Sequence, residues 1–100
     1  MFIDAIVIKE SDNVATALAT IEAEHTAVVG VAEKSIEISV RQKIPFGHKL
    51  AVRDIAAGED IIKYGEVIGR ATQPIRAGEH AHVHNIESLR GRGDLTGGGD

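Results

Sequence analysis

The chain has no cysteine and no tryptophan, and its 100 residues include one tyrosine, two phenylalanines and one methionine. The missing thiols exclude disulfides, thiolate catalysis and cysteine-ligated zinc or iron–sulfur sites. Because aromatic rings are so few, the core has to be built from Ile, Val, Leu and Ala, which favours short β-strands over a deep aromatic pocket. A chain of this length fits a single domain.

Long apolar runs and an excess of positive charge are also missing. No stretch approaches the ~20 apolar residues of a membrane span, and the opening sequence MFIDAIVIKE has no basic leader, so we expect a cytoplasmic protein that does not bind membranes. The net charge of −4 and the pI near 5.7 argue against a nucleic-acid binder, which would carry a basic patch.

The N-terminal third of the sequence predicts a strand followed by a helix. Residues 2–9 are rich in β-branched side chains and predict the strand. One short helix is expected over residues 12–22, because apolar residues recur there at i, i+3, i+4 and i+7 and small polar residues that can cap the first turn precede them. The apolar positions are Val14, Ala17, Leu18 and Ile21, and the capping candidates are Ser11, Asp12 and Asn13.

The rest of the chain predicts a small, mostly antiparallel β unit. Residues 36–40 alternate apolar and polar side chains, as in a half-buried strand, and the apolar runs that follow are too short for a βαβ crossover. Two segments, DIAAGEDII (54–62) and PIRAGEHAH (74–82), carry Ile, Ala, Gly and Glu at matching positions. We therefore expect two similar hairpins, with turns at 57–59 and 77–79.

Histidines are concentrated in one stretch, GEHAHVHN, which places His80, His82 and His84 at alternate positions. On a strand, alternate side chains share a face at a spacing of about 6.6 Å, so two neighbouring imidazoles can reach one metal but all three would be strained. His82 and His84 are therefore weak metal candidates, and we expect no metal to bind within this chain alone.

Two other interpretations of these histidines stay open. The histidines can be solvated on a polar sheet face, or His82, His84 and Asn85 can face a catalytic partner and its anionic substrate. In that case His80, nearer the turn, should matter less.

Two basic segments elsewhere suit an anion. In GHK, His48 and Lys49 follow a turn, where an imidazole, an ammonium and a backbone amide can gather around a carboxylate. In KYG, Lys63 can complete such a site, whereas Tyr64 is expected to pack in the core or at an edge. The plain alternative for GHK is a strand start with exposed ends. The sequence identifies no catalytic residue.

The order of these motifs resembles a known family. GHK, DIxxGE, IKYGxxIG and GExxHxHN follow one another at the intervals found in the SAF domain of the altronate and galactarate dehydratase family. The resemblance is strong over residues 44–88 and loose over the first 43. It implies a mostly β fold, a β-clip of bent hairpins, here with one short N-terminal helix. We expect the SAF domain to span residues 1–88 and the Gly-rich tail, 89–100, to be flexible.

The same resemblance implies a lyase that acts on hydroxy acids such as altronate, galactarate or sulfolactate. The chain would be its small subunit or N-terminal domain, inactive alone, with a larger catalytic partner and an anionic small-molecule substrate. Iron or another divalent metal is expected in that partner and no cofactor in this chain alone. The alternative function is a non-catalytic binding or regulatory module for sugar acids or a protein. Whether the chain is a natural subunit or a fragment, and whether it self-associates, stay open.

Overall fold

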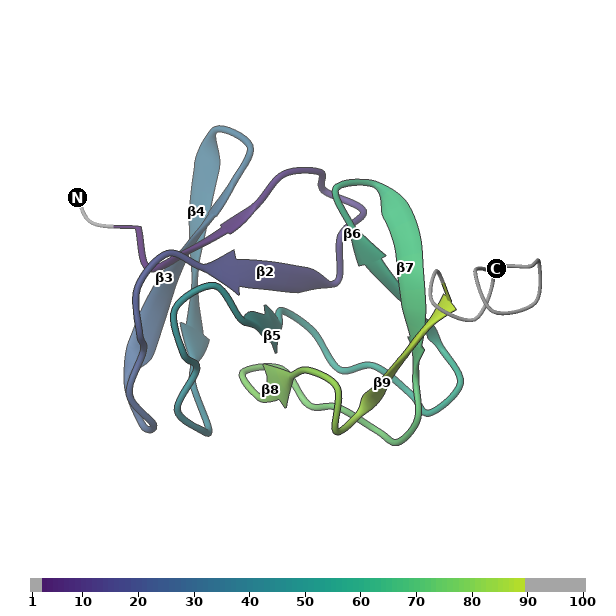
Figure 1. Ribbon diagram of the computed structural model, residues 1–100. Coiled ribbons are helices and arrows are strands. Elements are labelled where there is room, and N and C mark those ends of the chain that lie inside the picture. The colour runs from purple at the N-terminus through teal and green to yellow at the C-terminus, as the bar shows by residue number, and fades with distance from the viewer. Residues whose placement is uncertain (1–2, 90–100) are drawn as a thin grey trace.

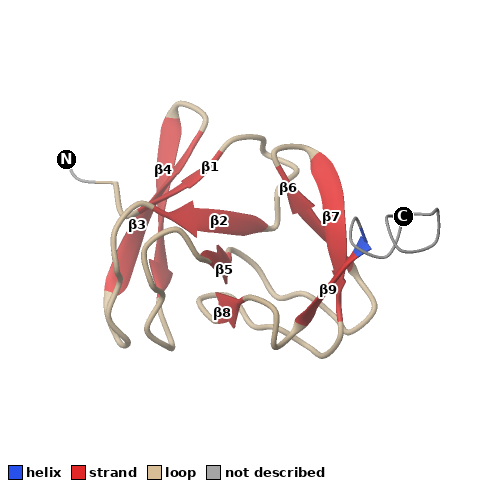
Figure 2. Cartoon of the chain, in the orientation of Figure 1, coloured by secondary structure: helices blue, strands red, loops and turns tan. Residues whose placement is uncertain are grey.

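The computed structural model describes residues 3–89, and residues 3–88 consist of short strands, turns and loops without a helix (Figures 1 and 2). None of the described segments forms a helix of the length and hydropathy that a membrane crossing needs. The strands are β1 (Ala5–Val7), β2 (Val14–Ala17), β3 (Thr26–Val31), β4 (Lys34–Ser39), β5 (Lys49–Ala51), β6 (Asp60–Lys63), β7 (Glu66–Ala71), β8 (His80–Ala81) and β9 (Ile86–Ser88). The mostly β fold predicted from the sequence is confirmed.

The strands form two sheets that lie on opposite sides of the view in Figure 1. The larger sheet has the strand order β4-β3-β1-β2-β5-β8, and the smaller has the order β6-β7-β9. All pairings are antiparallel except that of β1 with β3, which is parallel. The expected antiparallel character therefore holds for all but one of the strand pairs.

The predicted helix at 12–22 is wrong, because strand β2 occupies the middle of that segment. β2 pairs on one side with β1 and on the other with β5, so its backbone groups bond to neighbouring strands instead of to the next helical turn. Leu18, one of the four residues at helical spacing, is 47% exposed. The helical spacing was therefore a coincidence that sheet pairing overrode.

Strands β2 and β5 separate two hydrophobic cores and contribute side chains to both. Ala15 and Leu50 point into the core under the larger sheet, whereas Val14 and Ala51 point into a second core shared with the smaller sheet. Successive residues of a strand face opposite sides. Both faces of these two strands therefore contribute apolar side chains to a core.

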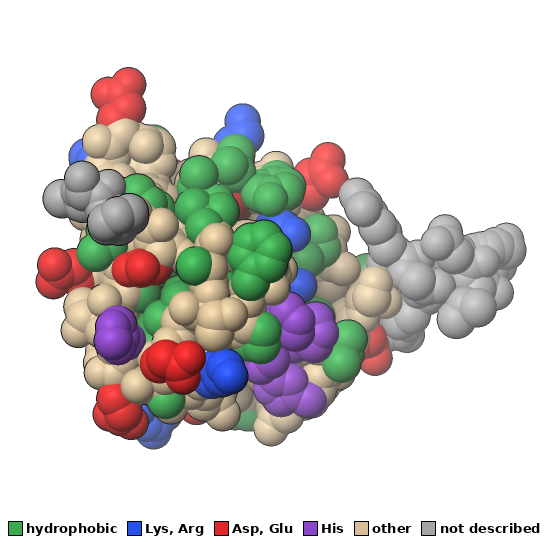
Figure 3. Space-filling model, turned by 60° about the vertical axis from the view of Figure 1, so that its left-hand side comes forward, with side chains coloured by type: hydrophobic (Ala, Val, Ile, Leu, Met, Phe, Trp, Pro, Cys, Tyr) green, Lys and Arg blue, Asp and Glu red, His purple; other side chains and the backbone are tan. Residues whose placement is uncertain are grey.

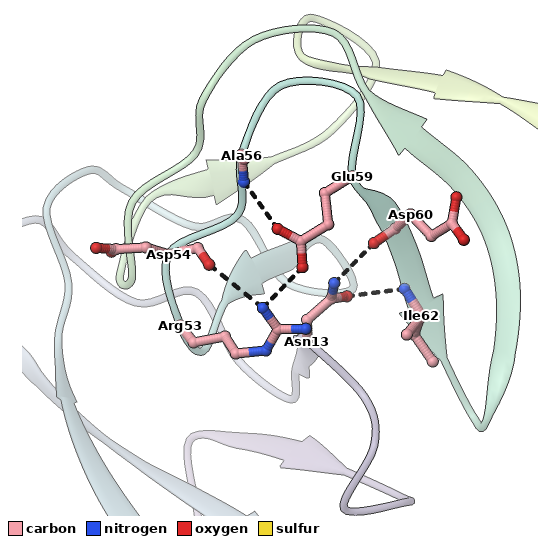
Figure 4. Close-up of polar contacts among 7 residues, drawn as sticks. All are labelled: Asn13, Arg53, Asp54, Ala56, Glu59, Asp60 and Ile62. Carbon is pink, nitrogen blue, oxygen red and sulfur yellow. Dashed lines mark hydrogen bonds and ion pairs between the residues drawn. The ribbon is translucent and has the colours of Figure 1, made fainter.

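Two polar residues between β1 and β2 join the two halves of the molecule. Asn13 is fully buried, and its amide donates to the Asp60 carbonyl at 2.8 Å and accepts from the Ile62 N–H at 2.7 Å (Figure 4). The Asp12 carboxylate accepts from the N–H groups of Tyr64 at 3.0 Å and Gly65 at 2.8 Å, which hold the turn between β6 and β7. The prediction that these residues cap a helix is wrong, because their side chains bind the backbone of residues 60–65 instead.

The two predicted glycine turns are confirmed, but neither forms a hairpin. Ile55 and Ile75 form an antiparallel bridge with each other, and each is followed by a turn in which a glycine has a positive φ, 86° at Gly58 and 88° at Gly78. Glycine adopts this conformation without the steric cost that a side chain brings. The strands that follow the two turns pair with other strands, β6 with β7 and β8 with β5. The predicted flexible tail lies, apart from Leu89, outside the described residues.

Candidate functional site

The candidate site is built where β5 meets β8. These strands pair with Lys49 opposite Ala81 and Leu50 opposite His80, which brings His48, just before β5, next to the histidines of the C-terminal segment. His48 Nδ1 lies 2.9 Å from His80 Nε2, so one of these nitrogens donates a hydrogen bond to the other.

The expected continuous strand over residues 80–85 is wrong, because the chain turns after Ala81. Asn85 holds this turn. Its backbone N–H donates to the His82 carbonyl at 3.0 Å, its Oδ1 accepts from the His82 N–H at 2.9 Å, and its Nδ2 donates to the His80 carbonyl at 2.9 Å. Asn85 is only 5% exposed, so its side chain shapes the turn from inside.

The turn folds His82 back onto His48, and three imidazoles come together. The rings of His48 and His82 stack with their centroids 4.1 Å apart, and those of His48 and His80 with theirs 5.1 Å apart. One ring nitrogen of each of the three histidines lies within 4.8 Å of the others, and all three residues are half-buried. His84 is exposed at the edge of this group, with its ring centroid 5.1 Å from that of His80. These residues form the histidine cluster, His48, His80 and His82.

Burial and nearby positive charge favour the neutral form of His80 and His82. Burial, and after it the nearby charge of His84, lowers the pKa of His80 to about 4. Burial also lowers the pKa of His82, with a further contribution from His48 and Lys49. The lowered pKa values therefore favour the uncharged imidazole at His80 and His82, the form that binds cations.

A cavity of about 380 Å³ adjoins the cluster, and it is lined by groups from both sheets. Lys49 of β5 and Lys63 of β6 meet there, and His82 belongs both to the cluster and to the cavity wall. Burial, and then the charge of Lys63, lowers the pKa of Lys49. Figure 3 shows histidine side chains gathered in one patch of the surface, with Lys or Arg side chains beside it.

The wall of this cavity is mixed in character. Tyr64 lies below the Lys63 ammonium, which sits 4.9 Å from the ring centroid. This tyrosine has a positive φ of 57° and lines the cavity at its edge, half exposed, as the sequence suggested for its packing. Ile68 and Ile86 supply apolar surface. The cavity therefore offers two ammonium groups and an imidazole in a partly apolar setting, which suits a small anion.

Of the residues that the sequence singled out, the structure brings His48, Lys49, Lys63 and His82 into one region. His84 borders this region, and Asn85 supports it from inside.

The central position of His80 was missed, because His80 lies nearer the turn and was expected to matter less. One signal in the sequence indicates a third turn of the same kind. Gly47, like Gly58 and Gly78, has a positive φ, and each of the three follows an isoleucine by three positions. The pairing of β5 with β8, which brings His48 next to His80, is not indicated by that pattern.

Comparison with known proteins finds relatives of two kinds, sulfo-lyase alpha subunits and sugar-acid dehydratases. The chain is 50% identical over 58 residues to the (2R)-sulfolactate sulfo-lyase subunit alpha of Chromohalobacter salexigens, which covers 58% of this chain and 62% of that protein. It is 35% identical over 63 residues to the subunit of the same name from Paracoccus pantotrophus, covering 63% of this chain and 94% of that protein. With the altronate dehydratase of Escherichia coli K12 it shares 46% identity over 77 residues, 77% of this chain but 15% of the enzyme.

The chain thus spans less than two thirds of the sulfo-lyase subunit from Chromohalobacter salexigens and a small part of the dehydratase. The family described as the altronate/galactarate dehydratase SAF domain matches residues 3–89, which is the whole of the described structure. The match includes both glycine turns, the histidine cluster and the lysine-lined cavity. The chain belongs to the altronate/galactarate dehydratase SAF domain family.

Proposed function

We propose that this chain is the small SAF unit of a lyase that acts on hydroxy acids, and that its lysine-lined cavity binds a carboxylate or sulfonate of the substrate. The observation that carries the proposal is the meeting of Lys49 and Lys63, from two different sheets, at one cavity. Both residues stand in motifs of the family, GHK and IKYG.

The electrostatics of the cavity support an anionic ligand. Burial, and after it the charge of Lys63, lowers the pKa of Lys49, and an anion between the two ammonium groups would stabilise their charged forms. A charge-assisted hydrogen bond from each ammonium to a carboxylate oxygen is stronger than a neutral one. The binding of a doubly charged acid would therefore relieve a repulsion that is present in the free protein.

The acids named in the relatives share one chemical feature. Altronate, galactarate and sulfolactate each carry a carboxylate next to a hydroxylated carbon, and elimination removes water or sulfite from the carbon β to the carboxylate. The carboxylate gains negative charge as the proton beside it is removed, so cations held at that position stabilise the transition state more than the ground state. Lys49 and Lys63 supply such cations in this proposal.

The remaining machinery is proposed to come from a larger catalytic partner. The described residues form one wall of a partly open cavity, and a partner that closes the other side would exclude water and strengthen each ionic contact. Val83, 81% exposed, projects beside the cavity and offers an apolar contact for that partner. The divalent metal expected from the family resemblance would lie in the partner, where it would stabilise the same developing charge.

The test is reconstitution of the chain with candidate large catalytic subunits from its own genome, assayed with altronate, galactarate and (2R)-sulfolactate. We expect elimination from one of these acids by the complex and none by either part alone. Lys49→Gln and Lys63→Gln should each lower kcat/KM by about tenfold or more, since a charge-assisted hydrogen bond is worth roughly 1.5–3 kcal/mol. Lys43→Gln, which removes an exposed lysine outside the cavity, is the matched control and should leave kcat/KM unchanged.

Two outcomes would contradict the proposal. If a lyase complex forms but Lys49→Gln and Lys63→Gln act like Lys43→Gln, the cavity does not bind the substrate. If no acid is turned over while the chain still binds sugar acids by calorimetry, the alternative function, a binding or regulatory module, is the correct one.

A further inference from the structure

The histidine cluster, which adjoins the lysine-lined cavity through His82, has the composition and spacing of a metal site. His48 comes from the segment before β5, and His80 and His82 from β8 and the turn after it, so two parts of the chain that are distant in sequence contribute ligands. The group contains three imidazoles and no carboxylate. This donor set suits zinc, iron, nickel or copper and is a poor one for magnesium or calcium, which prefer oxygen.

The distances between the nitrogens fit one metal ion. Two nitrogens at the usual metal distance of about 2.1 Å are separated by roughly 2.9–3.4 Å when the angle at the metal is between octahedral and tetrahedral. His48 Nδ1 and His80 Nε2 are already 2.9 Å apart, and the most distant ligand atoms of the cluster are 4.8 Å apart at most. The rings are stacked here, so coordination requires rotation about χ2, a soft torsion for histidine.

His82 provides an independent indication of a missing ligand. Its Nδ1 is buried and has no hydrogen-bond partner among residues 3–89. An unpaired buried polar atom costs about 1–3 kcal/mol, so such atoms are rare unless something binds them. A metal ion bound to this lone pair would remove the cost.

The backbone around the cluster is held in place before any metal binds. The His80 N–H donates to Gln42 Oε1 at 2.9 Å, and the His82 N–H donates to Asn85 Oδ1 at 2.9 Å. His80 is also fixed through its carbonyl, which accepts from Asn85 Nδ2. These contacts fix the backbone of two of the three ligand residues.

We infer that His48, His80 and His82 bind one divalent transition-metal ion and leave a coordination position open beside the lysine-lined cavity. Three protein ligands with one open position are typical of metal sites that also bind a small molecule. This inference departs from the expectation that no metal binds within the chain. It does not depend on the proposed lyase function, because it concerns a property of the isolated chain.

The test uses the purified chain, stripped with a chelator and titrated with Zn²⁺ by calorimetry in competition with a chromophoric chelator. We expect about one Zn²⁺ per chain, and no heat with Mg²⁺ at the same concentrations. Co²⁺ should bind with visible absorption bands that report nitrogen ligation. His48→Ala and His82→Ala should each weaken Zn²⁺ binding by about a hundredfold or more, at or beyond the upper end of the loss seen for an outer contact.

His25→Ala is the matched control, since His25 is exposed and does not belong to the cluster, and it should leave Zn²⁺ affinity unchanged. Should an alanine variant fail to fold, His82→Gln and His48→Gln, which keep most of the side-chain volume, replace it. The inference is overturned if Zn²⁺ binds no more tightly than it does to a chain lacking all three histidines, or if His25→Ala lowers affinity as much as His82→Ala.

Lys49→Gln separates this inference from the proposed function. This substitution should weaken binding of the acid but leave Zn²⁺ binding in place, because Lys49 is a neighbouring cation and not a metal ligand. Loss of Zn²⁺ binding in a folded Lys49→Gln protein would contradict the separation of the two sites.

Discussion

Two turns with the same sequence pattern, 56–59 and 76–79, fold alike but lie in different surroundings. In each turn the glutamate Oε1 accepts a hydrogen bond at 2.9 Å from the N–H three residues earlier, and the glycine has a positive φ. A Cβ built on Gly58 meets nothing within 4 Å, whereas a Cβ built on Gly78 overlaps the Ser39 carbonyl.

The difference arises from what the second turn contacts. The Gly78 carbonyl accepts from the Arg41 N–H at 2.9 Å, and the Ala77 carbonyl accepts from Arg41 Nε at 3.3 Å, so the chain after β4 crosses directly over this turn. The turn at Gly58 has instead an exposed ion pair, Glu59 with Arg53 at 2.9 Å (Figure 4). One glycine is therefore needed for its φ alone and the other for both φ and space.

The largest effect is expected from Gly78→Ala. The left-handed conformation costs a residue with a side chain about 1–2 kcal/mol, and overlap with a fixed backbone carbonyl adds about 1–3 kcal/mol, so unfolding free energy should fall by roughly 3 kcal/mol or more. Urea denaturation followed by circular dichroism measures this loss. A decrease below about 1 kcal/mol would mean that the strand end at Ser39 can move away freely.

Gly58→Ala should cost about 1–2 kcal/mol, because only the conformational penalty applies. Gly47→Ala is a matched variant, since Gly47 has a φ of 83° and a Cβ there also meets nothing within 4 Å. The two losses should agree with each other within the error of the denaturation curves. If Gly58→Ala proved as harmful as Gly78→Ala, the contrast between the two turns would be lost.

The smallest effect is expected from the charge of Glu59. The Ala56 N–H, and then Arg53, lower the pKa of Glu59, so its stabilising contribution is present above the ordinary glutamate pKa and is lost as pH falls through the lowered value. Glu59→Gln should reduce stability at pH 7 by no more than about 1 kcal/mol, the range of an exposed ion pair, and should make stability less dependent on pH below 5.

Glu79→Gln provides the comparison, because no salt bridge of Glu79 is present within residues 3–89. The difference between the two variants at pH 7 should shrink in 1 M salt, which screens the Arg53 charge. If the difference in stability between Glu59→Gln and Glu79→Gln is the same at low and high salt, the ion pair contributes nothing.

The sequence predicted the turns better than the segments between them. Glycines in repeated positions, as at Gly58 and Gly78, require one backbone conformation wherever they stand, so their pattern indicates the turn directly. The segment 12–22 was misjudged because β2 is buried on both faces, which removes the alternation that identifies a strand and leaves spacing that also fits a helix.

The candidate site shows the same limit. Lys49 and Lys63 were predicted as anion ligands from their motifs, but their meeting depends on the way the two sheets pack. The grouping of His48 with His80 and His82 depends on the turn that Asn85 holds. Alternation along one extended strand would instead keep the side chains of His80 and His82 about 6.6 Å apart. Contacts between distant segments follow from the fold as a whole, and the local patterns of a single sequence do not predict them.

The junction made by Asp12 and Asn13 also has a consequence for synthesis of the chain on the ribosome. The hydrogen bonds of these buried groups reach residues 49 and 53 positions later, at Ile62 and Gly65. Until Gly65 has left the exit tunnel, the N-terminal half holds two polar side chains that lack these later partners, and it cannot bury them without cost. Folding should therefore begin late in translation, and slowly, as in other proteins dominated by contacts between distant residues.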